Sequence, residues 1–309
     1  MRILLHRGDG VIEPWMREFA AIMPHARSVK WNEGDAALPC DYAVLWNPQP
    51  ELLGQLKEVK AIFLMGAGVD GLLRFGDAIP SVPLIRLGDA GMAIQMAEYV
   101  THAVLRYFRR FDDYERQART GLWSPLALHD REEFTIGVMG LGKLGLRVVE
   151  AMQHFGFPVR GWSRSAKALD GVRCFAGMEE FDEFLAGCRV LVSLLPLTQE
   201  TTSLLDRRRL SRLPAGAYLV NVARGAQVVE PDLLELIRAG HIAGATLDVF
   251  HDEPLPPQHP FWHEPRITIT PHISALTMRL DAVRQIAAKI DALEQGQPVD
   301  DIVDRNRGY

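Results

Sequence analysis

Short apolar runs alternate with segments of helical periodicity along most of the chain. In the N-terminal part, the spacing of apolar residues predicts helices over Glu13–Met23 and Glu51–Leu56. The apolar runs between them predict strands, namely Arg2–His6, Arg27–Trp31, Tyr42–Trp46, Ala61–Met65 and Leu84–Leu87. This alternation is typical of a parallel sheet with helices on both faces.

A long helical pattern follows and leads into a second alternating series. The pattern predicts one helix from about Ala90 to Arg119, because no Gly or Pro interrupts it before Gly121. The second series begins with a strand at Phe134–Met139, and a last helix, from Ala275 to about Glu294, is expected to return to the first domain. A chain of 309 residues has room for two domains. We therefore expect two doubly wound α/β domains, residues 1–98 with 276–309 and residues 99–275.

Composition and charge exclude several classes of protein. Hydrophobic residues make up 48% of the chain, which is enough for two cores and too many for a disordered protein. The 34 basic and 39 acidic residues leave a net charge of −5, which argues against nucleic acid as a partner. No apolar run approaches the ~18 residues that a membrane span requires, so we expect no membrane association.

The cysteines indicate a reducing compartment. Cys40, Cys174 and Cys188 are odd in number and far apart in the sequence, so they suit neither a disulfide framework nor a metal cluster. We expect reduced thiols, a cytoplasmic protein and no metal site.

A glycine-rich turn predicts a dinucleotide site in the second domain. The segment Gly140-Leu141-Gly142-Lys143-Leu144-Gly145 has GxGxxG spacing, follows a predicted strand and opens a predicted helix. The glycines permit a tight turn, close approach to a pyrophosphate and close packing of helix on strand, while the helix N-terminus presents N–H groups to the phosphates.

The end of the next strand favours NADP(H) over NAD(H). Ser163-Arg164-Ser165 stands where an NAD-binding unit carries an Asp or Glu for the ribose 2′-hydroxyl. A guanidinium flanked by two hydroxyls suits a 2′-phosphate instead. NAD(H) remains the weaker alternative.

Three polar residues, Arg224, Glu253 and His272, follow apolar strands further along the chain. In α/β sheets, ligands bind at the carboxyl ends of the strands. The three residues lie in the motifs Val222-Ala223-Arg224-Gly225, Asp248-Val249-Phe250 with Glu253-Pro254, and Pro271-His272-Ile273-Ser274. In this order after the glycine-rich turn, the motifs resemble those of the D-isomer-specific 2-hydroxyacid dehydrogenase family. The similarity spans most of the chain and includes Gly66-Ala67-Gly68-Val69-Asp70, which resembles the family's carboxylate-binding loop.

The resemblance implies a role for each residue that matches the family's motifs. Arg224 would hold the substrate carboxylate and polarise the 2-oxo group, His272 would be the general acid, and Glu253 would pair with His272. Backbone N–H groups at Gly68 and Val69 would bind the carboxylate as well. The family's cofactor-lining positions fall on Leu195, Val222, Asp248 and Ala275, with Asp248 near the nicotinamide carboxamide.

The resemblance also implies the domain roles and the reaction. Residues 99–275 would form a Rossmann cofactor domain, and residues 1–98 with 276–309 a flavodoxin-like substrate domain. Trp46 ends a strand and is a candidate to place its ring over the substrate, although inter-domain packing explains it as well. Within the family the chain is most similar to the glyoxylate/hydroxypyruvate reductases of type A. These reduce glyoxylate to glycolate and hydroxypyruvate to glycerate, with NADPH preferred.

Two other functions and one assembly state complete the expectations. The chain also fits a dehydrogenase of another D-2-hydroxyacid. Corepressors of the C-terminal-binding-protein kind resemble the same family and use the fold as a dinucleotide-sensing interaction module, but this chain lacks their long tails. The resemblance further implies a homodimer through the long helix.

Overall fold

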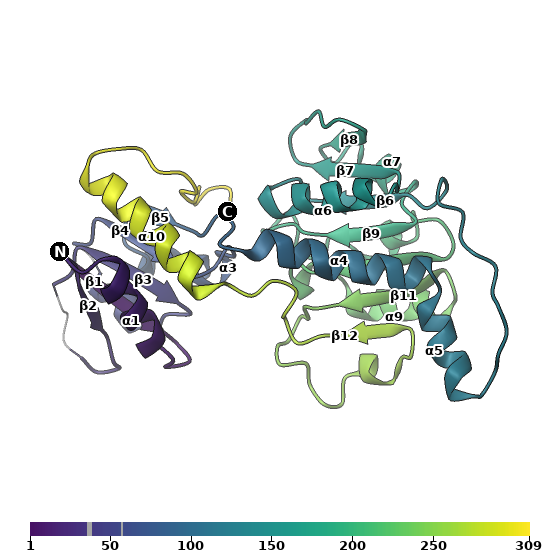
Figure 1. Ribbon diagram of the computed structural model, residues 1–309, viewed down its shortest axis with the longest axis horizontal. Helices are drawn as coiled ribbons and strands as arrows, with labels where there is room; N and C mark the ends of the chain where they lie inside the picture. The colour runs from purple at the N-terminus through teal and green to yellow at the C-terminus, as the bar shows by residue number, and fades with distance from the viewer. Residues whose placement is uncertain (36–38, 57) are drawn as a thin grey trace. The chain divides into compact units, whose positions relative to one another are not determined.

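Two parallel sheets form the framework of the chain in a computed structural model that describes residues 1–35, 39–56 and 58–309 (Figure 1). Each sheet belongs to one compact unit. Unit 1 comprises Met1–Gly91 and Thr277–Tyr309, and unit 2 comprises Met92–Leu276. The division falls at the start of a helix, whereas the expected boundary at 98/99 lies inside that helix. An unbroken helix belongs to one unit because its backbone hydrogen bonds make it a single element.

Unit 1 is a five-stranded sheet with the strand order β2-β1-β3-β4-β5. This is the flavodoxin-like order, so the expected fold of this unit is confirmed. Buried, mostly apolar strands such as Tyr42–Leu45 lie at its centre, because helices cover both faces of a doubly wound sheet. The elements are β1 (Arg2–Arg7), α1 (Glu13–Ile22), β2 (Arg27–Lys30), β3 (Tyr42–Trp46), α2 (Pro50–Gln55), β4 (Ala61–Leu64), α3 (Asp70–Leu73), η1 (Gly76–Ala78), β5 (Leu84–Ile85) and α10 (Arg279–Glu294).

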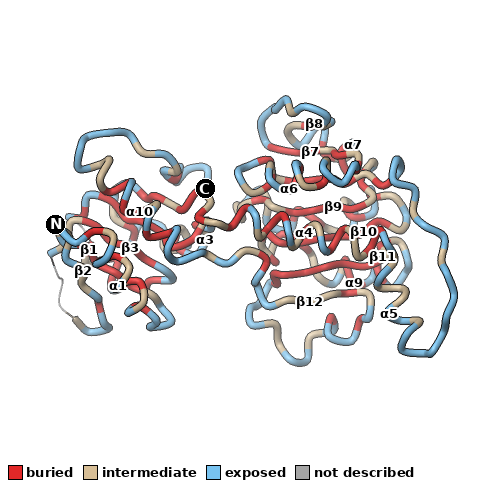
Figure 2. Tube along the Cα trace, in the orientation of Figure 1, coloured by how far each residue is buried: buried red, intermediate tan, exposed pale blue. Residues whose placement is uncertain are grey.

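Unit 2 is a seven-stranded sheet with the order β12-β11-β10-β9-β6-β7-β8. Read from β8, the chain order is 3-2-1-4-5-6 with one further strand, which confirms the Rossmann topology. Figure 2 shows buried residues concentrated along its strands. The elements are α4 (Met92–Phe108), α5 (Phe111–Arg119), β6 (Ile136–Met139), α6 (Lys143–His154), β7 (Val159–Ser163), β8 (Val172–Ala176), α7 (Phe181–Leu185), β9 (Val190–Ser193), α8 (Arg207–Leu210), β10 (Ala217–Asn221), η2 (Gly225–Gln227), α9 (Glu230–Arg238), β11 (Ile242–Leu247), η3 (Pro260–His263) and β12 (Ile267–Ile269).

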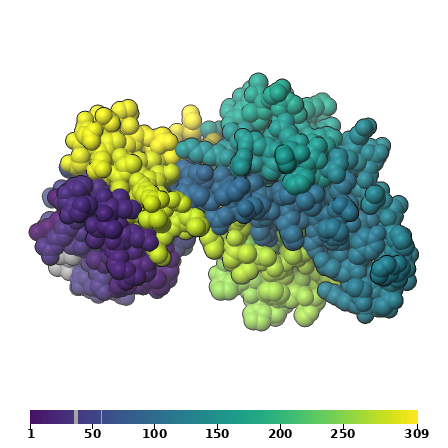
Figure 3. All heavy atoms as spheres, in the orientation of Figure 1, coloured from purple at the N-terminus to yellow at the C-terminus, as the bar shows by residue number. Residues whose placement is uncertain are grey.

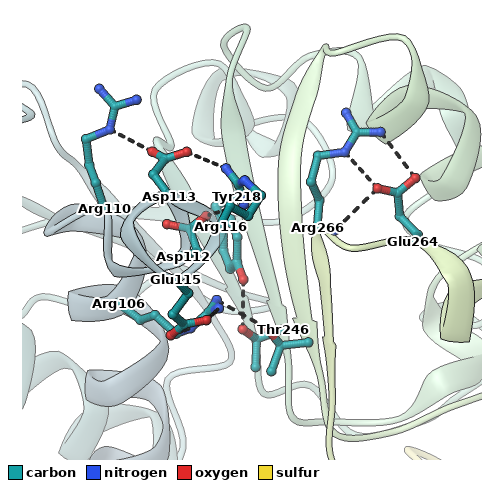
Figure 4. A network of polar contacts seen from close by, with 11 residues as sticks. Arg106, Arg110, Asp112, Asp113, Glu115, Arg116, Tyr218, Thr246, Glu264 and Arg266 are labelled. Atoms are coloured by element: carbon teal, nitrogen blue, oxygen red, sulfur yellow. Dashed lines mark hydrogen bonds and ion pairs between the residues drawn. The ribbon is translucent and has the colours of Figure 1, made fainter. Parts of the chain in front are cut away.

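The prediction of one helix over Ala90–Arg119 is wrong, because the chain turns between α4 and α5. Arg110 adopts a left-handed backbone with φ of 59°, which ends the first helix without any Gly or Pro. Ion pairs hold the turn: Arg106 Nη2 lies 2.6 Å from Glu115 Oε2, and Arg110 Nε lies 2.7 Å from Asp113 Oδ2 (Figure 4). The nine residues of α5 include none that is buried, so no apolar stripe continues past the turn.

Among the described residues, none of the helices combines the length and the apolar character that crossing a bilayer demands.

Candidate active site

Three neighbouring strands of unit 2 end in the turns that carry the expected catalytic residues. β10, β11 and β12 are adjacent and parallel, so their carboxyl ends lie at one edge of the sheet. Arg224 follows β10, Glu253 lies in the turn after β11, and His272 follows β12. The fold of unit 2 thereby brings these turns, which are far apart in the sequence, to the same edge.

The turn that carries Arg224 is fixed by a buried amide and by close backbone packing. Asn221 is buried; its Nδ2 donates to the Arg224 carbonyl over 3.1 Å, and its Oδ1 accepts the Ala223 N–H over 3.2 Å. A Cβ on Gly225 would lie 1.8 Å from the Phe250 carbonyl carbon, so only glycine permits this approach. The turns after β10 and β11 are therefore in direct contact.

Glu253 and His272 form the central pair of the site. His272 Nδ1 lies 2.8 Å from Glu253 Oε2, and Glu253 Oε1 accepts the Phe250 N–H over 2.9 Å. Burial alone would raise the pKa of the Glu253 carboxyl, but the hydrogen bonds from His272 and Phe250 and the charge of nearby Arg224 hold that pKa below its ordinary value. The carboxylate is thus kept ionised beside the ring.

Asp248 holds the backbone around His272. Its carboxylate is fully buried and accepts the N–H groups of Ile273 and Ser274, each over 2.8 Å, and the Thr270 hydroxyl over 2.6 Å. The Asp248 carbonyl accepts the His272 N–H over 2.8 Å. These bonds stabilise the left-handed backbone of His272, whose φ is 56°. The sequence reasoning missed Thr270, although a hydroxyl at the end of an apolar strand was a visible signal.

The glycine-rich turn has the shape that a dinucleotide pyrophosphate requires. A Cβ on Gly145 would lie 1.8 Å from the Gly140 carbonyl oxygen, and Gly140 has a φ of 102°. A Cβ on Gly142 would meet no described atom within 4 Å, which leaves open space in front of the turn. Helix α6 begins at Lys143, followed by Leu144, with Gly142 as a cap that has no side chain. Its first N–H groups and its dipole therefore suit an anion.

The end of β7 places polar and basic groups next to this turn. Ser163 is buried and its hydroxyl donates to the Ser165 carbonyl over 2.8 Å, which shapes the loop around Arg164. Lys167 Nζ donates to the Leu141 carbonyl over 2.5 Å, so the Lys167 ammonium lies at the glycine-rich turn. The sequence reasoning did not single out Lys167, although a base two residues after Ser165 was a visible signal.

The remaining expected cofactor positions also belong to unit 2. Val222 and Leu195 are buried and Ala275 is partly buried. The buried Gln227 donates to the carbonyls of Leu195 and Pro196, each over 3.0 Å, and thereby fixes the chain that leaves β9. Their expected contacts with the cofactor stay a prediction.

The expected substrate-binding residues Trp46, Gly68 and Val69 lie in unit 1. Trp46 ends β3 with 42% of its surface exposed. Its ring packs against Gly66, where a Cβ would lie 2.5 Å from the ring atom Cζ3. Gly68 is exposed, and Val69 is the buried residue that precedes α3. Their role toward a substrate stays a prediction.

Within residues 1–35, 39–56 and 58–309, no three or more His, Cys, Asp or Glu side chains form a group that could hold a metal ion.

Comparisons with known proteins identify the family of the chain. Residues 101–274 match the family described as D-isomer specific 2-hydroxyacid dehydrogenase, NAD binding domain. The chain is 45% identical over 314 residues to glyoxylate/hydroxypyruvate reductase A of Yersinia enterocolitica, with 100% of both proteins covered.

Two solved structures are similar over essentially the whole chain. A D-isomer specific 2-hydroxyacid dehydrogenase of Xanthobacter autotrophicus Py2, in complex with NADPH and MES, has a TM-score of 0.95 and 38% identity, covering 100% of this chain and 99% of that one. The NADPH-dependent glyoxylate/hydroxypyruvate reductase of Sinorhizobium meliloti, in complex with NADP and sulfate, has a TM-score of 0.93, 31% identity and the same coverage.

Proposed function

The chain belongs to the D-isomer-specific 2-hydroxyacid dehydrogenase family, and from this premise we propose that it reduces small 2-oxo acids with NADPH. The reactions are glyoxylate to glycolate and hydroxypyruvate to glycerate. The observation that carries the proposal is the His272–Glu253 pair, 2.8 Å apart, on the strand ends next to the turn of Arg224. The Yersinia relative, named for both substrates, supports the choice of substrate.

Each residue of the site has a distinct task in this reaction. NADPH, when bound, supplies the hydride that reaches C2 of the substrate. Arg224 pairs with the substrate carboxylate and polarises the 2-oxo group, because a guanidinium stays charged and binds carboxylates with two hydrogen bonds. Since His272 Nδ1 is engaged by Glu253, Nε2 is the ring nitrogen that gives its proton to the developing alkoxide. Glu253 fixes the orientation of the ring through its contact with Nδ1.

The preference for NADPH rests on the loop at the end of β7. Arg164 and the Ser165 hydroxyl would hold the 2′-phosphate, where an NAD-specific site has a carboxylate. The expected third ligand, the Ser163 hydroxyl, instead gives its hydrogen to the Ser165 carbonyl and shapes the loop. The NADPH and NADP complexes of the two similar structures support this assignment. NADH is the weaker cofactor in this proposal, and unit 2, Met92–Leu276, is the cofactor-binding domain.

Replacement of His272 tests the catalytic assignment. We expect His272→Ala to lower kcat for glyoxylate by about 10²–10⁴-fold, because the general acid is lost. NADPH binding, measured by fluorescence titration, should stay close to that of the wild type. Unchanged kcat would remove His272 as the acid. NADPH binding without reduction of any 2-oxo acid by the wild type would favour a dinucleotide-sensing module.

We also propose that the protein is a homodimer through α4. A groove of about 720 Å³ at α4 and α6 has Ile94, Ala97, Leu105 and Phe155 among its lining residues. Figure 3 shows the atoms of unit 2 as spheres, coloured by residue number. Ile94 is 46% exposed and Phe155 is 42% exposed, so apolar surface is available for a second copy. Light scattering should give twice the chain mass, and Ile94→Glu should give the monomer; a monomeric wild type would contradict the proposal.

Free thiols at Cys40, Cys174 and Cys188 support the cytoplasm as the compartment in which the enzyme works.

A further inference from the structure

The turn that carries Glu253 borders a cavity. Residues Phe250–Pro254 follow β11, and His251, Asp252 and Leu255 line a hollow of about 330 Å³. A segment next to open space has fewer packing contacts to hold its position than one inside a core. The position of Glu253 relative to His272 therefore depends on the hydrogen bonds that anchor this turn.

Glu230, the first residue of α9, provides such an anchor from outside the pair itself. Its Oε1 accepts the backbone N–H of His251 over 3.0 Å, two residues before Glu253. Its Oε2 lies 3.2 Å from His259 Nε2, and both side chains are largely buried, with 16% and 19% of their surfaces exposed. A single carboxylate thus joins the start of α9 to the beginning and the end of the segment from His251 to His259.

His259 is fixed in turn by the core. Its Nδ1 accepts the Phe261 N–H over 3.3 Å, and its ring packs edge-on against the Phe261 ring with centroids 4.6 Å apart. Phe261 is 1% exposed, so this contact ties the imidazole to a buried side chain. Because Nδ1 is an acceptor here, the ring carries its hydrogen on Nε2, the atom that faces Glu230.

The hydrogen bonds of Glu230 favour an acid at this position. Both groups that approach the Glu230 side chain, the His251 N–H and the His259 Nε2–H, are donors. A carboxylate accepts from both, whereas a glutamine of the same size presents one oxygen and one NH₂ group. The NH₂ group would oppose the hydrogen of His259, and that hydrogen cannot move to Nδ1 without breaking the bond from Phe261.

We propose that Glu230 is a positioning residue for the reduction: through the His251 N–H and His259 it fixes the turn that sets Glu253 against His272. The effect of Glu230 on reduction rests on the proposed function. Its effect on the contact between Glu253 and His272 does not. If the anchor is lost, the turn shifts toward the cavity and Glu253 stabilises the charged imidazole less well. The ring then loses its proton at lower pH, and reduction, which needs that proton, declines at lower pH as well.

The test compares Glu230→Gln with Asp252→Asn. Both remove one negative charge near the turn, and Asp252 is an exposed residue beside Glu253, so Asp252→Asn controls for charge alone. Asp248 and Arg224, the other charged groups around the pair, are unchanged in both variants. The first readout is an NMR titration of labelled histidine in the full chain without cofactor, with the His272 signal assigned from His272→Ala. The second is kcat for glyoxylate against pH.

We expect Glu230→Gln to move the His272 titration midpoint down by about half a pH unit, a roughly threefold change in the protonation ratio. The alkaline limb of the kcat profile should move in the same direction, while Asp252→Asn changes both by less. His259→Asn keeps an acceptor for the Phe261 N–H but removes the contact with Glu230, and we expect a smaller shift of the same sign. If Glu230→Gln does not fold, His259→Asn tests the inference in its place.

The inference is overturned if the His272 titration midpoint is the same in the wild type, Glu230→Gln and His259→Asn. It is also overturned if Asp252→Asn shifts the midpoint as much as Glu230→Gln does. A wild type that reduces no 2-oxo acid overturns the proposed function instead, and the NMR titration still decides the role of Glu230.

Discussion

At His272, the backbone and the ring are held by different partners. Asp248 bonds the N–H groups of Ile273 and Ser274, whereas Glu253 bonds the imidazole at Nδ1. The two sets of bonds come from the start and the end of the turn after β11, so the ring is oriented before any substrate binds. Such preorganisation lowers the cost of reaching the transition state.

Arg164 gives a residue-scale prediction about cofactor choice. If Arg164 binds the 2′-phosphate as proposed, Arg164→Ala removes a charged hydrogen-bond donor and should lower the ratio of kcat/KM with NADPH to that with NADH by about ten- to a hundredfold. Most of the change should appear in KM for NADPH, because NADH lacks the phosphate. The control is Arg173→Ala. Arg173 is an exposed arginine on β8 that pairs with Glu183 of α7. An unaltered ratio would exclude Arg164 from recognition of the phosphate.

The sequence reached the residues of the site through motifs, and the structure adds what motifs do not contain. Arg224, Glu253 and His272 could be expected together because each follows a strand of one parallel sheet. The three bonds of Asp248, the contact of Lys167 with Leu141 and the double acceptance by Glu230 depend on turn geometry. No local sequence pattern specifies that geometry, so these contacts were not predicted.

At the scale of elements, an ion pair stabilises the connection between η3 and β12. The Glu264 carboxylate accepts two bonds from the Arg266 guanidinium, at 2.7 and 3.2 Å, and its side chain is 6% exposed (Figure 4). The Arg266 bonds are the main cause that holds the pKa of Glu264 below its ordinary value, against the opposing effect of burial. The connection precedes the strand that leads to His272.

Glu264→Gln should therefore lower the free energy of unfolding by about 1–2 kcal/mol at pH 7. A lowered pKa in the folded state stabilises the protein above the unfolded value of about 4.3, and this stabilisation is lost as pH falls through the folded pKa. The difference between wild type and variant should accordingly shrink below pH 4 in thermal unfolding followed by circular dichroism. Glu183→Gln, in an exposed pair with Arg173, should change little. A constant difference at all pH values would contradict the assigned cause.

The element boundaries show where sequence patterns stop being informative. The break at Arg110 arises from a left-handed residue and from ion pairs of Arg106 and Arg110, with no breaker in the sequence. Helix α10 begins at Arg279 rather than Ala275, because Met278 before it has an extended backbone with φ of −73° and ψ of 105°. Strand β8 at Val172–Ala176 was not predicted, since only one of its five residues is buried. Periodicity identifies elements with a buried face and is less reliable for exposed ones.

For the whole molecule, the fold class follows from the alternation of strands and helices. Both sheets are parallel and have the strand orders of the expected fold classes, because buried strands separated by helices have few topologies that keep right-handed crossovers. The sequence did not locate the division at Gly91 and Met92, since the apolar stripe of α4 runs across the expected boundary without a change.

The central claim is that this chain transfers hydride from NADPH to small 2-oxo acids. Its most direct test is a steady-state panel of glyoxylate, hydroxypyruvate and pyruvate, each with NADPH and with NADH. The account predicts that glyoxylate and hydroxypyruvate are reduced and that kcat/KM is higher with NADPH. Tight binding of NADPH without reduction of any acid in the panel would contradict it.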